Sequence, residues 1–166
     1  MPCGGKMEVY VEPFLPQPEL MLVGQGRIAE LVAELGRLLH FRVTVNSPGA
    51  TREDFPFADQ LIADDTDYQK INPGLNSYVI VLTQHKGDQQ VIQAALRGTP
   101  RYIGLVASAK RSRLVVEYLK EGGMDADALR QVLRAPCGLD LGGRTPEEIA
   151  LSIVTEVVKL RHERTG

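Results

Sequence analysis

Apolar positions along this chain follow two different periods, and its first half gives the clearest example. Residues 20–23 form a continuous apolar run that stops at Gly24, as expected of a strand buried on both faces. Residues 28–39 then carry apolar side chains at steps of three and one, which places them on one stripe of a helix. Residues 41–45 form a second short strand pattern. The chain therefore predicts a strand, a helix and a second strand in succession.

The same alternation continues toward the carboxyl end. Residues 77–83 are a continuous run rich in β-branched side chains, which predicts a strand near the centre of a sheet. Strands that alternate with helices at this pace predict an α/β fold, a Rossmann-like, doubly wound, mostly parallel sheet with helices on both faces. The other predicted elements are a short strand at 60–63, a helix at 88–96, a strand at 102–106, and a helix that Ser108 caps and Gly122 ends.

The last helix has the clearest start signal. Thr145 is a good capping residue, Pro146 fits the first helical position, and Glu148 stands at the third position, where it completes a capping box. Apolar residues follow at helical spacing from Ile149 to Leu160. We therefore expect a long amphipathic helix that starts at Thr145.

The amino-terminal segment differs from the rest of the chain. Residues 7–12 alternate polar and apolar side chains, which predicts a half-exposed strand, and three prolines lead from it into the first core strand. This strand fits either the edge of the sheet or an arm that reaches a second subunit in a homo-oligomer. We divide the chain into an arm and linker at residues 1–18 and a Rossmann-like cofactor-binding domain at residues 19–166.

Composition excludes several classes of protein. The 166 residues are 43% apolar and 24% charged, as in ordinary globular domains, and no apolar run is long enough to cross a membrane. The N-terminus lacks a basic segment followed by an apolar one, so we expect a cytoplasmic protein. A net charge of −2 gives no general attraction to nucleic acid. The sequence has only two cysteines, which argues against a disulfide scaffold in a cytoplasmic protein. They form no C-x-x-C pair, which argues against a zinc site.

Gly24-x-Gly26-x-x-Ala29 lies between the first strand and the first helix. In that context the pattern is typical of a dinucleotide-binding turn. Gly24 makes the tight turn, Gly26 lets a phosphate approach the backbone, and Ala29 lets the helix pack closely on the strand. The alternative is a glycine turn that only packs the helix on the strand.

Polar residues follow the predicted strands at their carboxyl ends, where open α/β sheets bind ligands. They combine backbone donors, hydrogen-bonding side chains, an imidazole and two cations, which suits a phosphorylated ligand. Two cations at a helix N-terminus also oppose the helix dipole, although they could simply face water. The candidate binding residues are Gly24, Gln25, Gly26, Asn46, Thr83, His85, Ser108, Lys110 and Arg111.

Asn46 stands where an NAD-binding domain carries an acidic residue for the ribose hydroxyls. An amide still forms hydrogen bonds but brings no charge. This position therefore weakens the case for NAD and favours a nucleotide with an extra phosphate, or a ligand without nicotinamide.

His85, Asp88 and Cys137 are the candidates for chemistry. His85 and Asp88 fit an acid–base pair, but Asp88 also fits a cap on the next helix, with His85 in solvent. Cys137, in a glycine-rich loop, fits either a thiol that faces a ligand or a small buried residue. No catalytic residue is fixed by these patterns.

Residues 102–111 (YIGLVASAKR) and 135–150 (APCGLDLGGRTPEEIA) resemble the carboxy-terminal Rossmann domain of the XdhC/CoxI family. The resemblance implies a maturation factor, more a chaperone than an enzyme, for molybdenum hydroxylases such as xanthine dehydrogenase and carbon monoxide dehydrogenase. It implies binding of the molybdenum cofactor, delivery to the apo-hydroxylase and cooperation with a cysteine desulfurase.

Full-length members of that family carry a further amino-terminal domain, of which residues 2–9 resemble only the last part. The chain therefore looks like a split or stand-alone form that works with a separate XdhC-type amino-terminal partner. Two other readings stay open. One is a small NAD(P)-dependent oxidoreductase with His85 as the proton donor, and the other is a nucleotide-sensing assembly module.

Overall fold

The computed structural model describes residues 3–84 and 86–163. Its centre is a six-stranded sheet in the order β3-β2-β1-β4-β5-β6, and all the paired strands run parallel. This is the order of a doubly wound sheet that changes direction between β1 and β4. The strands are β1 (Glu19–Gly24), β2 (Arg42–Asn46), β3 (Gln60–Ile62), β4 (Ser77–Leu82), β5 (Tyr102–Leu105) and β6 (Leu133–Arg134).

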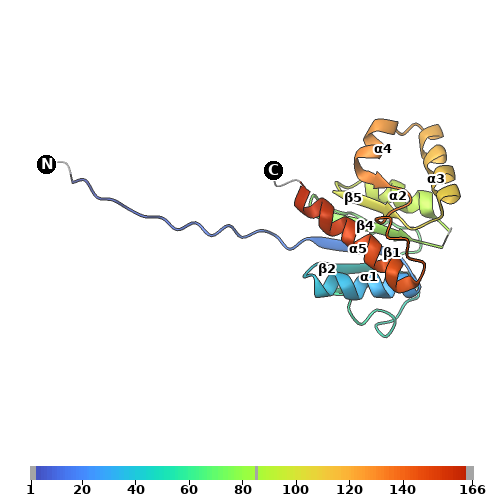
Figure 1. The fold of residues 1–166 in the computed structure, drawn as a ribbon, viewed down its shortest axis with the longest axis horizontal. Helices are drawn as coiled ribbons and strands as arrows, with labels where there is room; N and C mark the ends of the chain where they lie inside the picture. The colour runs from blue at the N-terminus through green and yellow to red at the C-terminus, as the bar shows by residue number, and fades with distance from the viewer. Residues whose placement is uncertain (1–2, 85, 164–166) are drawn as a thin grey trace.

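Helices cover both faces of the sheet, which confirms the predicted α/β, Rossmann-like fold (Figure 1). One face packs against α1 and α5, which lie side by side, and the other against α2, α3 and α4. Successive side chains of β1 show this alternation, because Leu20 and Leu22 belong to the first core and Met21 and Val23 to the second. The helices are α1 (Arg27–Leu38), α2 (Asp88–Leu96), α3 (Ala109–Glu121), α4 (Ala126–Val132) and α5 (Pro146–Glu163).

Two helix starts follow the signals in the sequence. Ser108 Oγ accepts a hydrogen bond of 3.1 Å from the backbone N–H of Arg111 and so caps α3. At α5 the Thr145 hydroxyl accepts a 3.1 Å bond from Glu148 N–H, and Glu148 Oε2 accepts one of 3.1 Å from Thr145 N–H. The predicted capping box is therefore present.

The structure departs from the sequence pattern around β6, at one edge of the sheet, and in the segment that precedes β1. α4 and β6 were not predicted, because each is too short to show a clear period. The strand predicted at residues 7–12 is wrong, since residues 3–18 contain no strand and run as an extended trace away from the sheet (Figure 1). An alternating pattern makes a strand only where a neighbouring strand supplies hydrogen bonds.

The base of this extended segment is nevertheless fixed to the domain. Pro16 O accepts a 3.1 Å bond from the side chain of Asn76, and Pro18 O accepts a 2.9 Å bond from the backbone of Arg42. The segment therefore leaves from the amino-terminal edge of the sheet, opposite the edge where ligands bind. None of the described helices is long and apolar enough to cross a membrane.

Candidate functional site

The glycine turn between β1 and α1 forms the centre of the carboxyl edge. Gly24 and Gly26 have φ angles of +133° and +104°, in the region that favours glycine. A Cβ on Gly24 would lie 2.1 Å from Leu82 O on the neighbouring strand, so this position needs glycine for the strands to stay paired. Ala29 is fully buried, as expected for close packing of the helix on the sheet. Backbone conformation or close packing thus explains why each of the three positions of the motif carries a small residue.

Gly26 is also the N-cap of α1, and as a glycine it offers this helix no capping side chain. The first N–H groups of a helix have no partner within it, and they carry the positive end of its dipole. A Cβ on Gly26 would meet only the Gln84 side chain, at 3.0 Å. The turn therefore presents backbone donors without obstruction, which is the arrangement that binds a phosphate or another anion.

Two pockets flank the glycine turn, and Gln25, Gly26 and Gln84 line both of them. The loop pocket has a volume of about 280 Å³, and its remaining lining residues are Glu30, Pro48, Gly49, Ala50, Asp54 and Phe55. The α5 pocket has a volume of about 350 Å³, and its remaining lining residues are Arg27, Ile28, Leu82, Val106 and Pro146.

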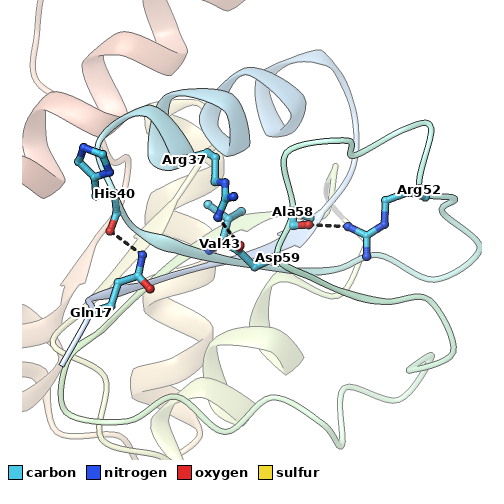
Figure 2. A network of polar contacts seen from close by, with 7 residues as sticks. All are labelled: Gln17, Arg37, His40, Val43, Arg52, Ala58 and Asp59. Atoms are coloured by element: carbon cyan, nitrogen blue, oxygen red, sulfur yellow. Dashed lines mark hydrogen bonds and ion pairs between the residues drawn. The ribbon is translucent and has the colours of Figure 1, made fainter.

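The segment between β2 and β3 carries Asp54. Figure 2 shows contacts within this segment and at its carboxyl-terminal end. Arg52 donates a hydrogen bond to the backbone oxygen of Ala58, which closes the loop on itself. Asp59 pairs with Arg37 of α1 and accepts a 2.8 Å bond from Val43 N–H. These contacts fix the loop against α1 and β2 and so hold the wall of the loop pocket.

Asn46 ends β2, but it lines neither pocket. Its side chain is 1% exposed and donates a 2.7 Å hydrogen bond to Asp65 Oδ2. Asp65 in turn accepts bonds from the backbone of Gln69 and Lys70. The amide of Asn46 therefore organises the loop after β3.

Thr83, Asp88 and Arg111 form a separate polar cluster between α2 and α3. Asp88 is 2% exposed, accepts a hydrogen bond from the Thr83 hydroxyl and pairs with Arg111 Nε at 3.2 Å. The prediction that Asp88 caps α2 is wrong, because Gly87 is the N-cap and Asp88 is the first helical residue. The sequence left open whether the cations at the start of α3 meet a ligand or face water, and Arg111 instead pairs with this carboxylate of the same chain.

Lys110 and Ser108 lie at the start of α3 and are exposed. Neither lines the two pockets, and the same holds for Thr83 and Arg111. The candidate binding residues thus divide into two groups. Gly24, Gln25 and Gly26 form the turn, whereas the residues around α3 lie outside its pockets.

Cys137 is half-buried beneath α5, where its backbone N–H donates to Leu105 O at 2.9 Å. Burial and then the nearby Glu156 carboxylate raise the pKa of its thiol to about 12, while a hydrogen bond with Tyr102 acts in the opposite direction. Glu156 itself accepts a hydrogen bond from the Tyr102 hydroxyl and one of 3.0 Å from Gly138 N–H. These surroundings favour the neutral thiol and argue against a reactive thiolate.

His85, the candidate proton donor, lies outside the described residues. Within residues 3–84 and 86–163, no three histidine, cysteine, aspartate or glutamate side chains gather closely enough to hold a metal ion. The backbone donors at the turn and the polar pocket walls suit the binding of an anion.

Arg27, Gln84, Glu30 and Asp54 were not among the candidate residues. Arg27 and Gln84 each follow a predicted candidate in the sequence, so proximity to the turn was a usable signal. Glu30 lies one turn into α1, where helical spacing also points it to the same edge. Asp54 gave no such signal, because it lies inside an irregular loop.

Known proteins include relatives that are similar to this chain in sequence. The YqeB protein of Escherichia coli K12 is 26% identical over 99% of this chain and 31% of its own length. A Bacillus subtilis 168 protein described as a probable subunit of xanthine dehydrogenase is 29% identical over 92% of this chain and 46% of its own. The chain thus spans less than half the length of these relatives.

Solved structures also include proteins that are similar to this chain. A protein described as a xanthine dehydrogenase from Bacillus halodurans superposes with a TM-score of 0.77 and 27% identity over 90% of this chain and 44% of that one. ChuY of E. coli CFT073, at 14% identity and a TM-score of 0.54, shares the fold alone. Residues 20–157 match the family described as the XdhC Rossmann domain. The chain therefore belongs to the XdhC Rossmann domain family.

Proposed function

We propose that this chain binds the molybdenum cofactor, in its free or nucleotide-extended form, and helps to insert it into a molybdenum hydroxylase. Membership of the XdhC family supports this proposal, as do relatives whose names refer to xanthine dehydrogenase. The single observation that carries it is the uncapped start of α1 at Gly26, which offers backbone donors to a phosphate between two pockets.

The residues at the turn fit the phosphate of that cofactor. Gly26 leaves room for an oxygen to approach the backbone, and Arg27 adds a cation at the first position of α1. Arg27 already pairs with Glu30 at 3.3 Å and Glu147 at 3.7 Å, and its side chain is 58% exposed. It is therefore positioned to exchange these weak exposed pairs for a phosphate. When bound, the cofactor supplies the redox chemistry of the client enzyme, and the residues of this chain hold the cofactor through its phosphate.

The kind of site that is present supports a role in delivery. Backbone donors at an edge hold a phosphate without any covalent step, which suits temporary binding. The partners in this proposal are an XdhC-type amino-terminal domain, the apo-hydroxylase and a cysteine desulfurase. A homo-oligomer joined through residues 3–18 is part of the same proposal.

Purification from a host that makes molybdenum cofactor tests the proposal. The protein is purified without oxygen, its bound pterin is oxidised to a fluorescent product, and the pterin per chain is measured for the wild type and Gly26→Ala. Gly123→Ala is the matched control, because Gly123 has a φ of +95° with nothing within 4 Å of an added Cβ. Both variants carry similar backbone strain, but only the first places a methyl group in the turn.

We expect pterin to be retained by the wild type and Gly123→Ala and to fall at least tenfold, about 1.4 kcal/mol, in Gly26→Ala. Equal retention by both variants would remove the glycine turn as the phosphate site. Absence of pterin from all three proteins, with and without the hydroxylase present, would contradict the proposed function.

A further inference from the structure

The two pockets share one wall, and that wall includes the glycine turn proposed to bind an anion. Gln25, Gly26 and Gln84 line both pockets, so a phosphate bound at the turn has a pocket on each side. A ligand with one organic group on its phosphate would fill only one of these pockets. A diphosphate that joins two organic groups would fill both pockets. The residues that line the loop pocket therefore indicate which kind of organic group it could bind.

The loop pocket lies where a nucleotide ribose would be expected, past the end of β2. In Rossmann domains an acidic side chain at the end of that strand accepts hydrogen bonds from the ribose hydroxyls. Asn46 occupies the equivalent position, but it is buried, bonded to Asp65 and absent from the pocket wall. Any group that binds a ribose here must therefore come from elsewhere.

Asp54 and Glu30 bring carboxylates to this pocket from two different elements. Asp54 Oδ2 accepts hydrogen bonds of 2.7 Å and 2.9 Å from the backbone N–H and hydroxyl of Thr51, which hold the pKa of this carboxyl below its ordinary value. The group is therefore ionised at neutral pH and fixed in direction. Glu30 lies in the first turn of α1 and lines the same pocket, and its side chain also pairs with Arg27 at 3.3 Å.

The charges of the pocket also discriminate between ligands. Among the described residues that line it, two are carboxylates and none is lysine or arginine. Carboxylates accept hydrogen bonds from hydroxyl groups but repel a phosphate at the same place. The loop pocket therefore suits a neutral vicinal diol and disfavours a ribose with a 2′-phosphate.

We propose that the loop pocket is a ribose subsite, in which Asp54 and Glu30 accept hydrogen bonds from the free 2′- and 3′-hydroxyl groups of a nucleotide whose diphosphate lies at the glycine turn. The inference rests on the proposed function for the phosphate at the turn. It narrows the ligand to a nucleoside diphosphate derivative with an unmodified ribose, with the second organic group in the α5 pocket.

Titration calorimetry with simple probes tests the subsite. The wild type is titrated with ADP, GDP and CDP, and then with the 2′-deoxy and 2′-phosphorylated forms of the tightest binder. The variants are Asp54→Asn and Glu30→Gln, which keep side-chain size and remove charge. Asp64→Asn is the matched control, because Asp64 is an exposed aspartate outside the pocket that bonds Lys70 at 2.7 Å.

We expect the wild type and Asp64→Asn to bind the ribose form at least about tenfold more tightly than the 2′-deoxy form, as for one hydrogen bond to a charged group. The 2′-phosphorylated form should bind more weakly still. Asp54→Asn should reduce the preference over the 2′-deoxy form to about threefold or less and improve binding of the 2′-phosphorylated form. Glu30→Gln should also reduce the preference over the 2′-deoxy form and improve binding of the 2′-phosphorylated form.

Three results would overturn the subsite: equal affinity of the wild type for ribose and 2′-deoxy forms, an Asp54→Asn variant that behaves like Asp64→Asn, or no binding of any of the three diphosphates. The last result, found together with pterin retention that depends on Gly26, would refute the subsite and leave the proposed function standing. Ribose discrimination that depends on Asp54, found without any pterin, would support the subsite and refute the proposed function.

Discussion

The side-chain amide of Asn46 donates a hydrogen bond of 2.7 Å to Asp65 Oδ2, and both side chains are buried. Asp65 also accepts bonds of 2.8 Å and 3.0 Å from the backbone N–H groups of Gln69 and Lys70. A buried carboxylate needs donors on all sides, and Asn46 supplies one that an aspartate could not. Asn46, which the sequence suggested as an uncharged ribose-binding residue, thus stabilises the fold instead.

Asn46→Asp tests this relationship. The change places a second carboxylate against Asp65 and removes a donor, so we expect the free energy of unfolding to fall by about 3–5 kcal/mol at pH 8. Lower pH should restore part of this loss, because the folded variant takes up a proton between the two carboxyl groups that the unfolded chain does not hold. Urea denaturation of the variant and the wild type at pH 5.5 and pH 8 measures both effects.

The double variant Asn46→Asp with Asp65→Asn is the control for Asn46→Asp. It restores an amide opposite a carboxylate, and we expect it to recover part of the stability lost at pH 8. A loss as large in the double variant as in the single one, with no dependence on pH, would contradict the assigned role of the pair.

Gly24→Ala should destabilise the sheet. The added Cβ would lie 2.1 Å from Leu82 O, a backbone atom that cannot move without breaking the pairing of β1 with β4. Gly49→Ala is the control, because Gly49 has a φ of +81° but open space around an added Cβ. We expect Gly24→Ala to cost at least about 2 kcal/mol more than the control, as overpacking adds to strain. Similar denaturation midpoints for the two variants would show that the close approach is relaxed in solution.

Cys137 should react slowly with alkylating reagents. Its pKa is raised to about 12, so the reactive thiolate is rare at pH 8. In a Cys3→Ser background, where Cys137 is the remaining cysteine, we expect iodoacetamide to react about a thousandfold more slowly than with free cysteine. The rate should rise about tenfold per pH unit between pH 8 and pH 10. A fast rate that levels off near pH 8 would instead indicate a thiol activated for chemistry.

Asp88→Asn should lower stability because it leaves the Arg111 guanidinium without the buried carboxylate between α2 and α3. We expect a loss of about 3 kcal/mol in the free energy of unfolding. Arg130→Gln is the comparison, since its pair with Asp127 has side chains 72% and 80% exposed. That variant should change stability by less than about 0.5 kcal/mol. Equal losses of stability for the two variants in thermal melts would show that the buried pair of Asp88 contributes no more to stability than the exposed pair of Arg130.

Much of the fold was predictable because its signals are local. The unit β1–α1–β2 followed from apolar periodicity, and α2 begins and ends at the predicted residues. The capping box at Thr145 and Glu148 lies within four residues of sequence and formed as expected. In contrast, the predicted strand at residues 7–12 failed, since a strand depends on a partner that a local pattern does not reveal.

The candidate site divides in the same way. The glycine turn could be predicted from the local pattern alone, because Gly24, Gly26 and Ala29 act within one strand, turn and helix. In contrast, the hydrogen bond from Asn46 to Asp65, nineteen residues away, and the place of Asp54 in the pocket wall depend on how the chain folds in three dimensions. Side-chain partners at such separations depend on how the loops close over the sheet edge, and the free energy of that packing is shared among many residues rather than encoded in a motif.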